Sequence, residues 1–172
     1  KLKSEYLFQT RGMGSYVKSW HIRNLGDILK LGSQMPNAFN FLQGLWLSRK
    51  FIGLERELPL LQKELLSDWW SDNKLEQNNH NITVWVIADI FTQYYDVDIG
   101  RDMLNLLKKC KVNIRVIFPK VSIVAMISYG FLDEAKDGLK ALYNQLDNIS
   151  KNDIIVGIEP SEVLVWRDEA KS

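Results

Sequence analysis

The sequence predicts an α/β fold: a small three-layer unit with a short parallel sheet of three strands, preceded by a helical N-terminal segment packed on it. Three short apolar runs carry this prediction, at residues 82–89, 112–118 and 153–158. Each run is rich in β-branched residues and is followed by a stretch of helical periodicity, which is typical of parallel strands buried on both faces. Crossovers between such strands are right-handed, so the loops after the strands gather at one edge. A ligand of this unit is therefore expected at the carboxyl ends of the strands.

The N-terminal segment, residues 1–80, is predicted to form short helices interrupted by glycine and proline. One helix is expected to open at Pro36, because proline suits the first helical turn. Another is expected over 59–70, with leucine and tryptophan on one face. The polar stretch 71–80 is the clearest linker in the chain. It separates the helical segment from an α/β domain expected over 81–172.

The helices of the second half are expected at 97–110, 129–147 and 160–169. The residues of the first helix expected to face the sheet are Ile99, Met103, Leu106 and Cys110. This placement makes Cys110 a small core or boundary residue rather than a reactive thiol. The second helix is expected to start after a cap at Ser128, and its leucines repeat by three and four, as in a helix laid on a sheet.

Composition narrows the classes of function. Of the 172 residues, 46% are hydrophobic and 25% are charged, and the net charge is +1, which gives no basic surface for nucleic acid. No apolar run reaches the roughly 20 residues that span a bilayer, and no secretory leader is evident. A cytoplasmic location is therefore expected, with any contact to the inner face of the membrane made through a larger complex. Cys110 is the one cysteine, so the chain alone cannot build a thiolate metal cluster.

Sequence motifs for common cofactors and catalytic groups are missing. No Gly-x-Gly-x-x-Gly follows the first strand, and there is no phosphate-binding lysine loop. His21 and His80 lie in different segments, so neither indicates a metal site. No catalytic residue and no metal ligand are predicted.

Polar side chains near the ends of the predicted strands are the candidate site. They are Asp89, Thr92, Ser122, Glu159, Ser161 and Glu162. One interpretation is that they cap helices and bond to loop backbone, as Asp, Ser and Thr often do. The other is that they converge in a pocket for a small molecule or for a hard cation such as Mg²⁺ or Ca²⁺. The sequence leaves both interpretations open.

Three stretches carry a resemblance to a known family. They are Phe91-Thr-Gln-Tyr-Tyr-Asp-Val-Asp-Ile-Gly-Arg, Met126-Ile-Ser-Tyr-Gly-Phe-Leu-Asp-Glu-Ala-Lys and Val156-Gly-Ile-Glu-Pro-Ser-Glu-Val-Leu-Val-Trp-Arg-Asp-Glu. They resemble the cysteine-rich C-terminal region of FAD-linked oxidases that are fused to an iron–sulfur module. That family includes D-lactate and D-2-hydroxyglutarate dehydrogenases and the iron–sulfur subunit of glycolate oxidase.

The resemblance implies that this chain is the tail of a larger flavoenzyme, an oxidoreductase. In that family a 2-hydroxy acid reduces FAD in a separate domain, and electrons then pass through iron–sulfur centres. The implied cofactors of the parent protein are therefore FAD and iron–sulfur clusters. The implied partners of this chain are the other domains or subunits of that enzyme.

The chain departs from the family at the positions of the cluster cysteines. Val121, Ser122 and Ile123 stand in place of Cys-Cys-Gly, Glu162 stands in place of another cysteine, and some members have a cysteine at Ile90. Cluster ligation needs cysteine thiolates, with histidine as an occasional substitute. The resemblance therefore implies a degenerate copy without a cluster, whose work is structural. The alternative is a binding module for a small molecule or a hard cation, built from the strand-end polar residues.

Overall fold

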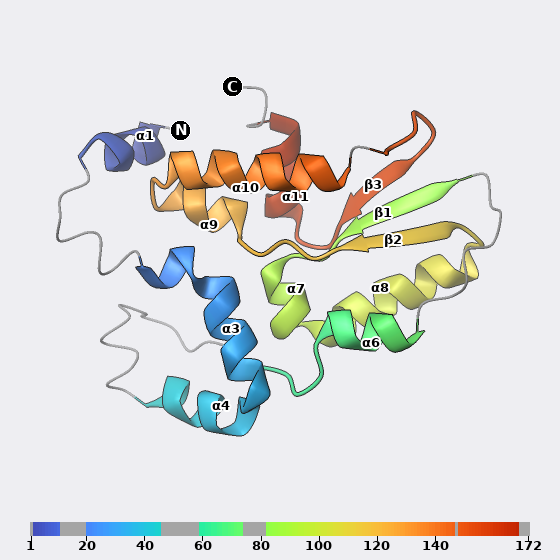
Figure 1. Cartoon of the computed structure of the whole chain (residues 1–172), viewed down its shortest axis with the longest axis horizontal. Helices are drawn as coiled ribbons and strands as arrows, with labels where there is room; N and C mark the ends of the chain where they lie inside the picture. Colours follow the sequence, from blue (N-terminus) through green and yellow to red (C-terminus); the bar gives the residue numbers. More distant parts are fainter. Residues whose placement is uncertain (1, 11–19, 46–58, 74–81, 147, 169–172) are drawn as a thin grey trace.

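The computed structural model describes residues 2–10, 20–45, 59–73, 82–146 and 148–168. In its N-terminal part the helices are α1 (Leu2–Gln9), α3 (Leu25–Gln34), α4 (Pro36–Gly44) and α6 (Leu66–Asn73). Strands and helices then alternate as β1 (Thr83–Ile87), α7 (Ile90–Tyr94), α8 (Val97–Lys109), β2 (Asn113–Ile117), α9 (Ile123–Ser128), α10 (Leu132–Gln145), β3 (Ile154–Gly157) and α11 (Pro160–Asp168). Figure 1 shows this order along the chain.

The three strands form one parallel sheet in the order β2-β1-β3. In the register, Val84 of β1 lies between Ile114 of β2 and Ile154 of β3. The predicted parallel sheet of three strands is confirmed, and each strand is somewhat shorter than its apolar run. The loops after the strands meet at one edge of the sheet, where α7, α9 and α11 begin (Figure 1).

The sheet lies between two layers of helices, as Figure 1 shows. On one face, Val84 and Val86 pack with Leu66 of α6 and Leu104 of α8. On the other face, Trp85 of β1 packs with leucines of α10. Burial on both faces explains why β1, the central strand, is a continuous apolar run without alternation, whereas β2 and β3 at the two edges are more exposed.

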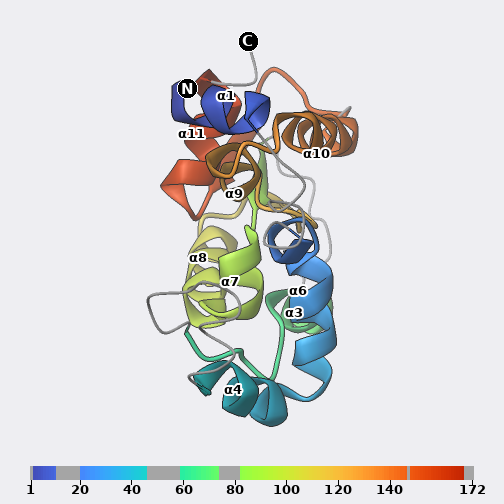
Figure 2. The same cartoon turned by 90° about the vertical axis from the view of Figure 1, so that its left-hand side faces the viewer.

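The N-terminal helices pack on this unit. In one buried cluster, Leu29 of α3 and Leu61 pack against Ile90 and Tyr94 of α7 and against Tyr95, the C-cap of α7. The backbone of α3 also lies very close to the loop after β2 at Gly26. A Cβ on Gly26 would lie 2.2 Å from the carbonyl oxygen of Lys120. In Figure 2, α3 lies beside α7, at the carboxyl ends of the strands. Glycines in α3 are therefore points of contact, although in the sequence they look like interruptions.

The helix predicted over 59–70 is wrong in its first half. Residues 59–65 are not helical, and α6 begins at Leu66 and runs to Asn73. Leu61 is buried nonetheless, and Asn40 of α4 holds its backbone through two hydrogen bonds. The Leu61 backbone N–H donates to Oδ1 of Asn40 at 2.8 Å, and Nδ2 of Asn40 donates to the Leu61 carbonyl at 3.0 Å. The remainder of the predicted linker, 74–80, lies outside the described residues.

The position of α8 was predicted correctly, but the face turned to the sheet was not. The buried residues are Val97, Gly100 and Leu104, whereas the predicted inner residues Ile99 and Leu106 are 57% and 60% exposed. Cys110 is exposed as well, so its assignment to the core or boundary is wrong. Gly100 explains the true orientation, since a Cβ there would lie 2.3 Å from a methyl carbon of Leu66.

The single helix predicted over 129–147 is two helices, α9 and α10. Ser128 ends α9 and does not cap α10, whose N-cap is Phe131. Gly130 separates the two helices with φ of 73°, a left-handed conformation that glycine adopts without strain. The predicted inner stripe of α10 is present, with Ala135 and Leu142 buried.

Candidate functional site

Asp89, which directly follows β1, is the N-cap of α7. Its Oδ1 accepts hydrogen bonds from the backbone N–H of Phe91 at 2.8 Å and of Thr92 at 3.1 Å. Its Oδ2 accepts a hydrogen bond from the Thr92 hydroxyl at 2.6 Å. Both side chains are 3% exposed. Asp89 and Thr92 therefore lie together, and their side chains bond to each other and to the first turn of α7.

Ser122 and Glu162 come from two different strand-end loops and are joined by a hydrogen bond. The Ser122 hydroxyl donates to Oε1 of Glu162, and its oxygen accepts from the Ala125 backbone N–H at 3.1 Å as the N-cap of α9. The backbone N–H groups of Ile123 and Val124 also lie near the Glu162 carboxylate and favour its charged form. Glu162 thus binds α11 to the first turn of α9.

Glu159 and Ser161 do not join this cluster. Oε1 of Glu159 accepts hydrogen bonds from the Ser161 hydroxyl at 2.6 Å and from the Ser161 backbone N–H at 3.2 Å. Both bonds are exposed and close the first turn of α11. Of the six predicted site residues, the structure therefore brings four together and leaves these two as a local cap.

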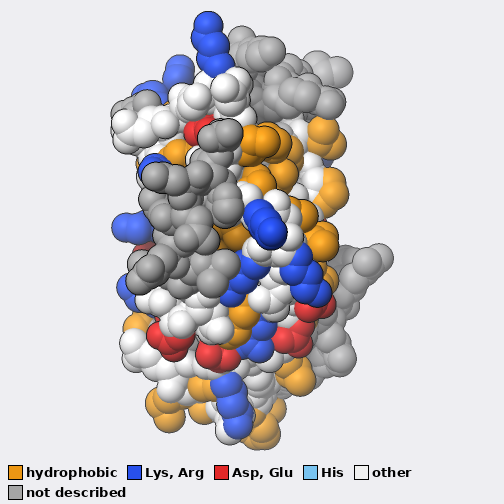
Figure 3. All heavy atoms as spheres, turned by 90° about the vertical axis from the view of Figure 1, so that its right-hand side faces the viewer, with side chains coloured by type: hydrophobic (Ala, Val, Ile, Leu, Met, Phe, Trp, Pro, Cys, Tyr) orange, Lys and Arg blue, Asp and Glu red, His pale blue; other side chains and the backbone are white. Residues whose placement is uncertain are grey.

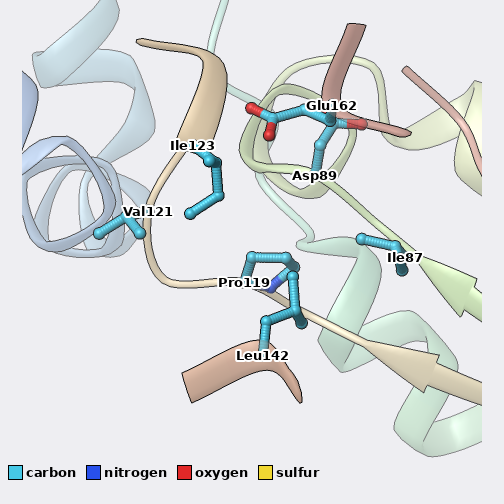
Figure 4. A pocket seen from close by; sticks show the side chains of 7 residues that line it. All are labelled: Ile87, Asp89, Pro119, Val121, Ile123, Leu142 and Glu162. Carbon is cyan, nitrogen blue, oxygen red and sulfur yellow. The ribbon is translucent and has the colours of Figure 1, made fainter. Parts of the chain in front are cut away.

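The space between the strand ends is small and apolar. Figure 4 shows its lining, which comes from the end of β1, the loops after β1 and β2, and the helices α9, α10 and α11. The lining residues are Ile87, Asp89, Pro119, Val121, Ile123, Leu142 and Glu162. Its volume of about 10 Å³ is close to the space of one water molecule. A ligand pocket for a small organic molecule is usually some 300–1,000 Å³, about thirty times this volume or more.

Burial dominates the electrostatics of the site. It raises the pKa of Glu162 above its ordinary value, and the nearby Asp89 carboxylate adds to that rise. The hydrogen bond from Ser122 and the backbone N–H groups of Val124 and Ile123 act in the opposite direction, because they favour the charged form. The net direction is upward, so the fold favours the protonated form of Glu162.

The residues at the cluster positions of the resembled family do not fit an iron–sulfur cluster. Ile90 and Ile123 are each 1% exposed and belong to apolar clusters, and Ser122 is bonded to Glu162. Among the described residues, no group of three or more His, Cys, Asp and Glu side chains is arranged to hold a metal ion. Cys110 lies at the end of α8, next to the start of β2 and thus at the opposite edge of the sheet.

Two features of this site were not predicted from the sequence. The first is α9, whose N-cap Ser122 bonds to Glu162, because Ile123-Val-Ala-Met-Ile is short and rich in β-branched residues. The second is the cover of this edge by α3 through the contact of Gly26 with Lys120. A signal for α9 was present: Ser122 is a good N-cap residue before that run.

Fold and site together define a small parallel α/β unit whose strand-end polar groups bond to one another. The chain is similar to D-2-hydroxyglutarate dehydrogenase of Escherichia coli (strain K12), with 31% identity over 157 residues that cover 82% of this chain and 15% of that protein. It is also similar to D-2-hydroxyglutarate dehydrogenase of Haemophilus influenzae, with 28% identity over 120 residues that cover 66% of this chain and 12% of that protein. No protein-family model matches the chain, and no solved structure matches it significantly.

D-2-hydroxyglutarate dehydrogenase is one of the proteins that the sequence resemblance named, and both relatives carry that name. The chain spans about one seventh of the length of the first relative and about one eighth of the second. The assignment to a cysteine-rich region and the loss of its cluster stay predictions. Across the described residues, the helices are all too short or too polar to cross a membrane.

Proposed function

We propose that this chain is a non-catalytic, structural part of an oxidoreductase of the D-2-hydroxyglutarate dehydrogenase type. The observation that carries the proposal is the closed state of the strand-end site. Asp89 bonds to Thr92, Ser122 bonds to Glu162, and about 10 Å³ remains between them. A site that transfers electrons or binds a substrate needs groups that are free to meet it, and these four side chains meet one another.

In this proposal a hydrogen bond replaces metal ligation at the cluster positions. Ser122 and Glu162 both stand where the resembled family has cysteine, and they come from the two segments that a shared cluster would join. Their hydrogen bond is buried, where an unpaired partner is costly, so it can hold α9 and α11 together without a metal. FAD and iron–sulfur clusters would then belong to other parts of the parent enzyme, and this part is expected to remain in the cytoplasm.

Exposed apolar side chains of the N-terminal helices support a packing role. Leu31 of α3 is 67% exposed, and Met35, the C-cap of α3, is 68% exposed. Phe41 of α4 is 70% exposed, and Leu60, which precedes α6 in the sequence, is 66% exposed. In Figure 3, some orange side chains lie at the lower end of the molecule, the end at which α4 lies in Figure 1. Several exposed apolar side chains on neighbouring helices often mark an interaction surface. We propose that other domains or subunits of the parent enzyme cover them.

The alternative function, binding of a small molecule or a hard cation at the strand ends, draws no support from this geometry. Mg²⁺ and Ca²⁺ are held by about six or more oxygen ligands, including free carboxylate oxygens or waters. Here the lining of the remaining space is largely aliphatic, and the carboxylates of Asp89 and Glu162 already accept several hydrogen bonds.

The test is to identify the native polypeptide that carries this sequence. An antibody against the 172-residue chain would be used to isolate the protein from the source cells, followed by mass and flavin measurements. We expect a polypeptide several times larger than 20.0 kDa that contains flavin. A native protein of about 20.0 kDa without flavin or partners would contradict the proposal.

A further inference from the structure

The helix α8 carries a second apolar stripe that faces away from the sheet. The first stripe, Val97, Gly100 and Leu104, is buried against the core. The residues of the second stripe, called the outer stripe below, are Ile99, Met103, Leu106 and Cys110. Ile99 and Leu106 are 57% and 60% exposed, Cys110 is exposed, and Met103 is half-buried. A stripe of this kind on a helix that is already packed requires its own explanation.

The spacing of the outer stripe identifies the kind of structure that fits it. Its residues follow one another by four, three and four positions, which is the spacing of the a and d positions at a seam between two helices. In the described part of the chain, α8 packs against α6, α7 and β2, and this packing leaves the outer stripe open. The complementary element is therefore another helix.

The charges along α8 indicate which helix would pack against the outer stripe. The N-terminal half carries Asp98 and Asp102, and the C-terminal half carries Lys108 and Lys109. Asp102 and Lys109 each directly precede a residue of the outer stripe, so both flank the seam on the same side. Lys108 lies over the rings of Trp69 and Trp70 of its own chain, which leaves Lys109 as the flanking cation. A helix with the same charges, running in the opposite direction, would place an aspartate beside each lysine.

We propose that the outer stripe of α8 binds the same stripe of a second copy of this chain, antiparallel, in a symmetric dimer. In this arrangement Met103 packs against Leu106 of the other copy, and Ile99 packs against its Cys110. Asp102 lies beside Lys109 of the other copy, and the twofold axis repeats every contact. In a parallel pair, Asp102 and Lys109 of one copy would lie on the opposite side of the seam from Asp102 and Lys109 of the other, so neither ion pair would form and the charges favour the antiparallel orientation.

The dimer is expected to be weak. Four side chains from a helix of 13 residues bury less than the roughly 800 Å² per partner of a standard interface. Self-association is therefore expected in the micromolar range rather than the nanomolar range. This inference does not depend on the proposed function, since an isolated chain and a larger enzyme can both associate through α8.

The first experiment is sedimentation equilibrium of the 172-residue chain in reducing buffer, up to about 1 mM. We expect a monomer–dimer equilibrium for the natural chain. Leu106→Glu should abolish the dimer, because it places two charges in an apolar seam. The matched control is Leu164→Glu, since Leu164 is a leucine of α11 that is 45% exposed and outside the seam. Thermal unfolding of each variant checks that it remains folded. A natural chain that stays monomeric up to this concentration overturns the proposal.

A charge exchange tests the orientation. Asp102→Lys and Lys109→Asp should each weaken the dimer about fivefold or more, because each creates two like-charge contacts. The double variant restores both opposite-charge contacts, so its dissociation constant should return to within about twofold of the natural value. Asp137→Lys, an equal change of charge on exposed α10, serves as the control. A double variant that is weaker than either single variant overturns the antiparallel seam.

The alkylation rate of the Cys110 thiol provides an independent test of the dimer. In the proposed dimer its thiol lies under Ile99 of the other copy, so alkylation should become several-fold slower as the chain is concentrated through the dimerisation range. The same rate at every concentration would place the contact elsewhere and overturn the assignment to this stripe.

Discussion

The hydroxyl of Ser122 donates a hydrogen bond to the carboxylate of Glu162, although the two residues are 40 positions apart in the chain. Both residues are buried, at 5% and 7% exposure. The bond links the N-cap of α9 to the first turn of α11 and thereby closes the carboxyl edge of the sheet. The structural role proposed for this chain depends on that closure.

Removing the Glu162 carboxyl group should destabilise the fold. Glu162→Ala leaves the buried Ser122 hydroxyl without its acceptor, and a buried unsatisfied group costs about 1–3 kcal/mol. Glu162→Gln keeps an acceptor oxygen and adds a donor for Ser122, so we expect it to stay within about 1 kcal/mol of the natural chain. Urea unfolding measures both variants, and equal midpoints for the two would contradict the bonding described here.

Stability should decrease as the pH rises above the ordinary pKa of glutamate. Burial raises the pKa of Glu162 from 4.5, so between the unfolded and folded pKa values the folded state binds more protons than the unfolded state. The free energy of unfolding therefore falls with increasing pH through that window and levels off above the folded pKa. Glu162→Gln lacks this titration, so its stability relative to the natural chain should rise through the same window. Parallel urea midpoints for both proteins from about pH 4 to about pH 8 would show that Glu162 does not titrate in this way.

Gly26 should not tolerate a side chain. The Cβ of Gly26→Ala would lie 2.2 Å from the Lys120 carbonyl oxygen, so α3 must move away from the strand-end loop. We expect a loss of about 1–3 kcal/mol, despite the better helix propensity of alanine. Gly44 is the matched control because a Cβ there has no atom within 4 Å. Gly44→Ala should be neutral or slightly stabilising in thermal unfolding, and a loss equal to that of Gly26→Ala would argue against close packing of α3.

Val121→Asp should cost far more stability than Glu162→Gln. Val121 lines the small apolar space at the strand ends and packs with the cluster around Ile123 and Met126. An unpaired charge placed there is expected to cost several kcal/mol, on the order of 3 kcal/mol or more. Similar urea midpoints for the two variants would place Val121 outside the core.

The sequence was most informative where burial leaves a simple pattern. The strand around Val86 was predicted because it is a continuous apolar run, and the leucine stripe of α10 was predicted because it has helical periodicity. The orientation of α8 was not predictable in the same way, since its two stripes have nearly the same spacing. Glycine at position 100 hid the inner stripe, because the contact with Leu66 depends on the absence of a side chain.

The candidate site was predicted in part for a similar reason. Parallel topology brings Asp89, Ser122 and Glu162 to one edge, and the sequence showed that topology. Whether they form a pocket or bond to one another depends on the turn of α9 and on the cover from α3. Both follow from long-range contacts, such as that of Gly26 with Lys120, which local patterns do not reveal.

The most direct test of the structural role is a measurement of iron and acid-labile sulfide in the purified 172-residue chain after anaerobic reconstitution. Cys110→Ser, which removes the single cysteine, is the control for adventitious iron. We predict a colourless protein with the same trace of iron as this control, because Ser122 and Glu162 bond to each other and no thiolate stands beside them. Stoichiometric iron and sulfide, with absorption near about 400 nm from thiolate–iron charge transfer, would contradict the account.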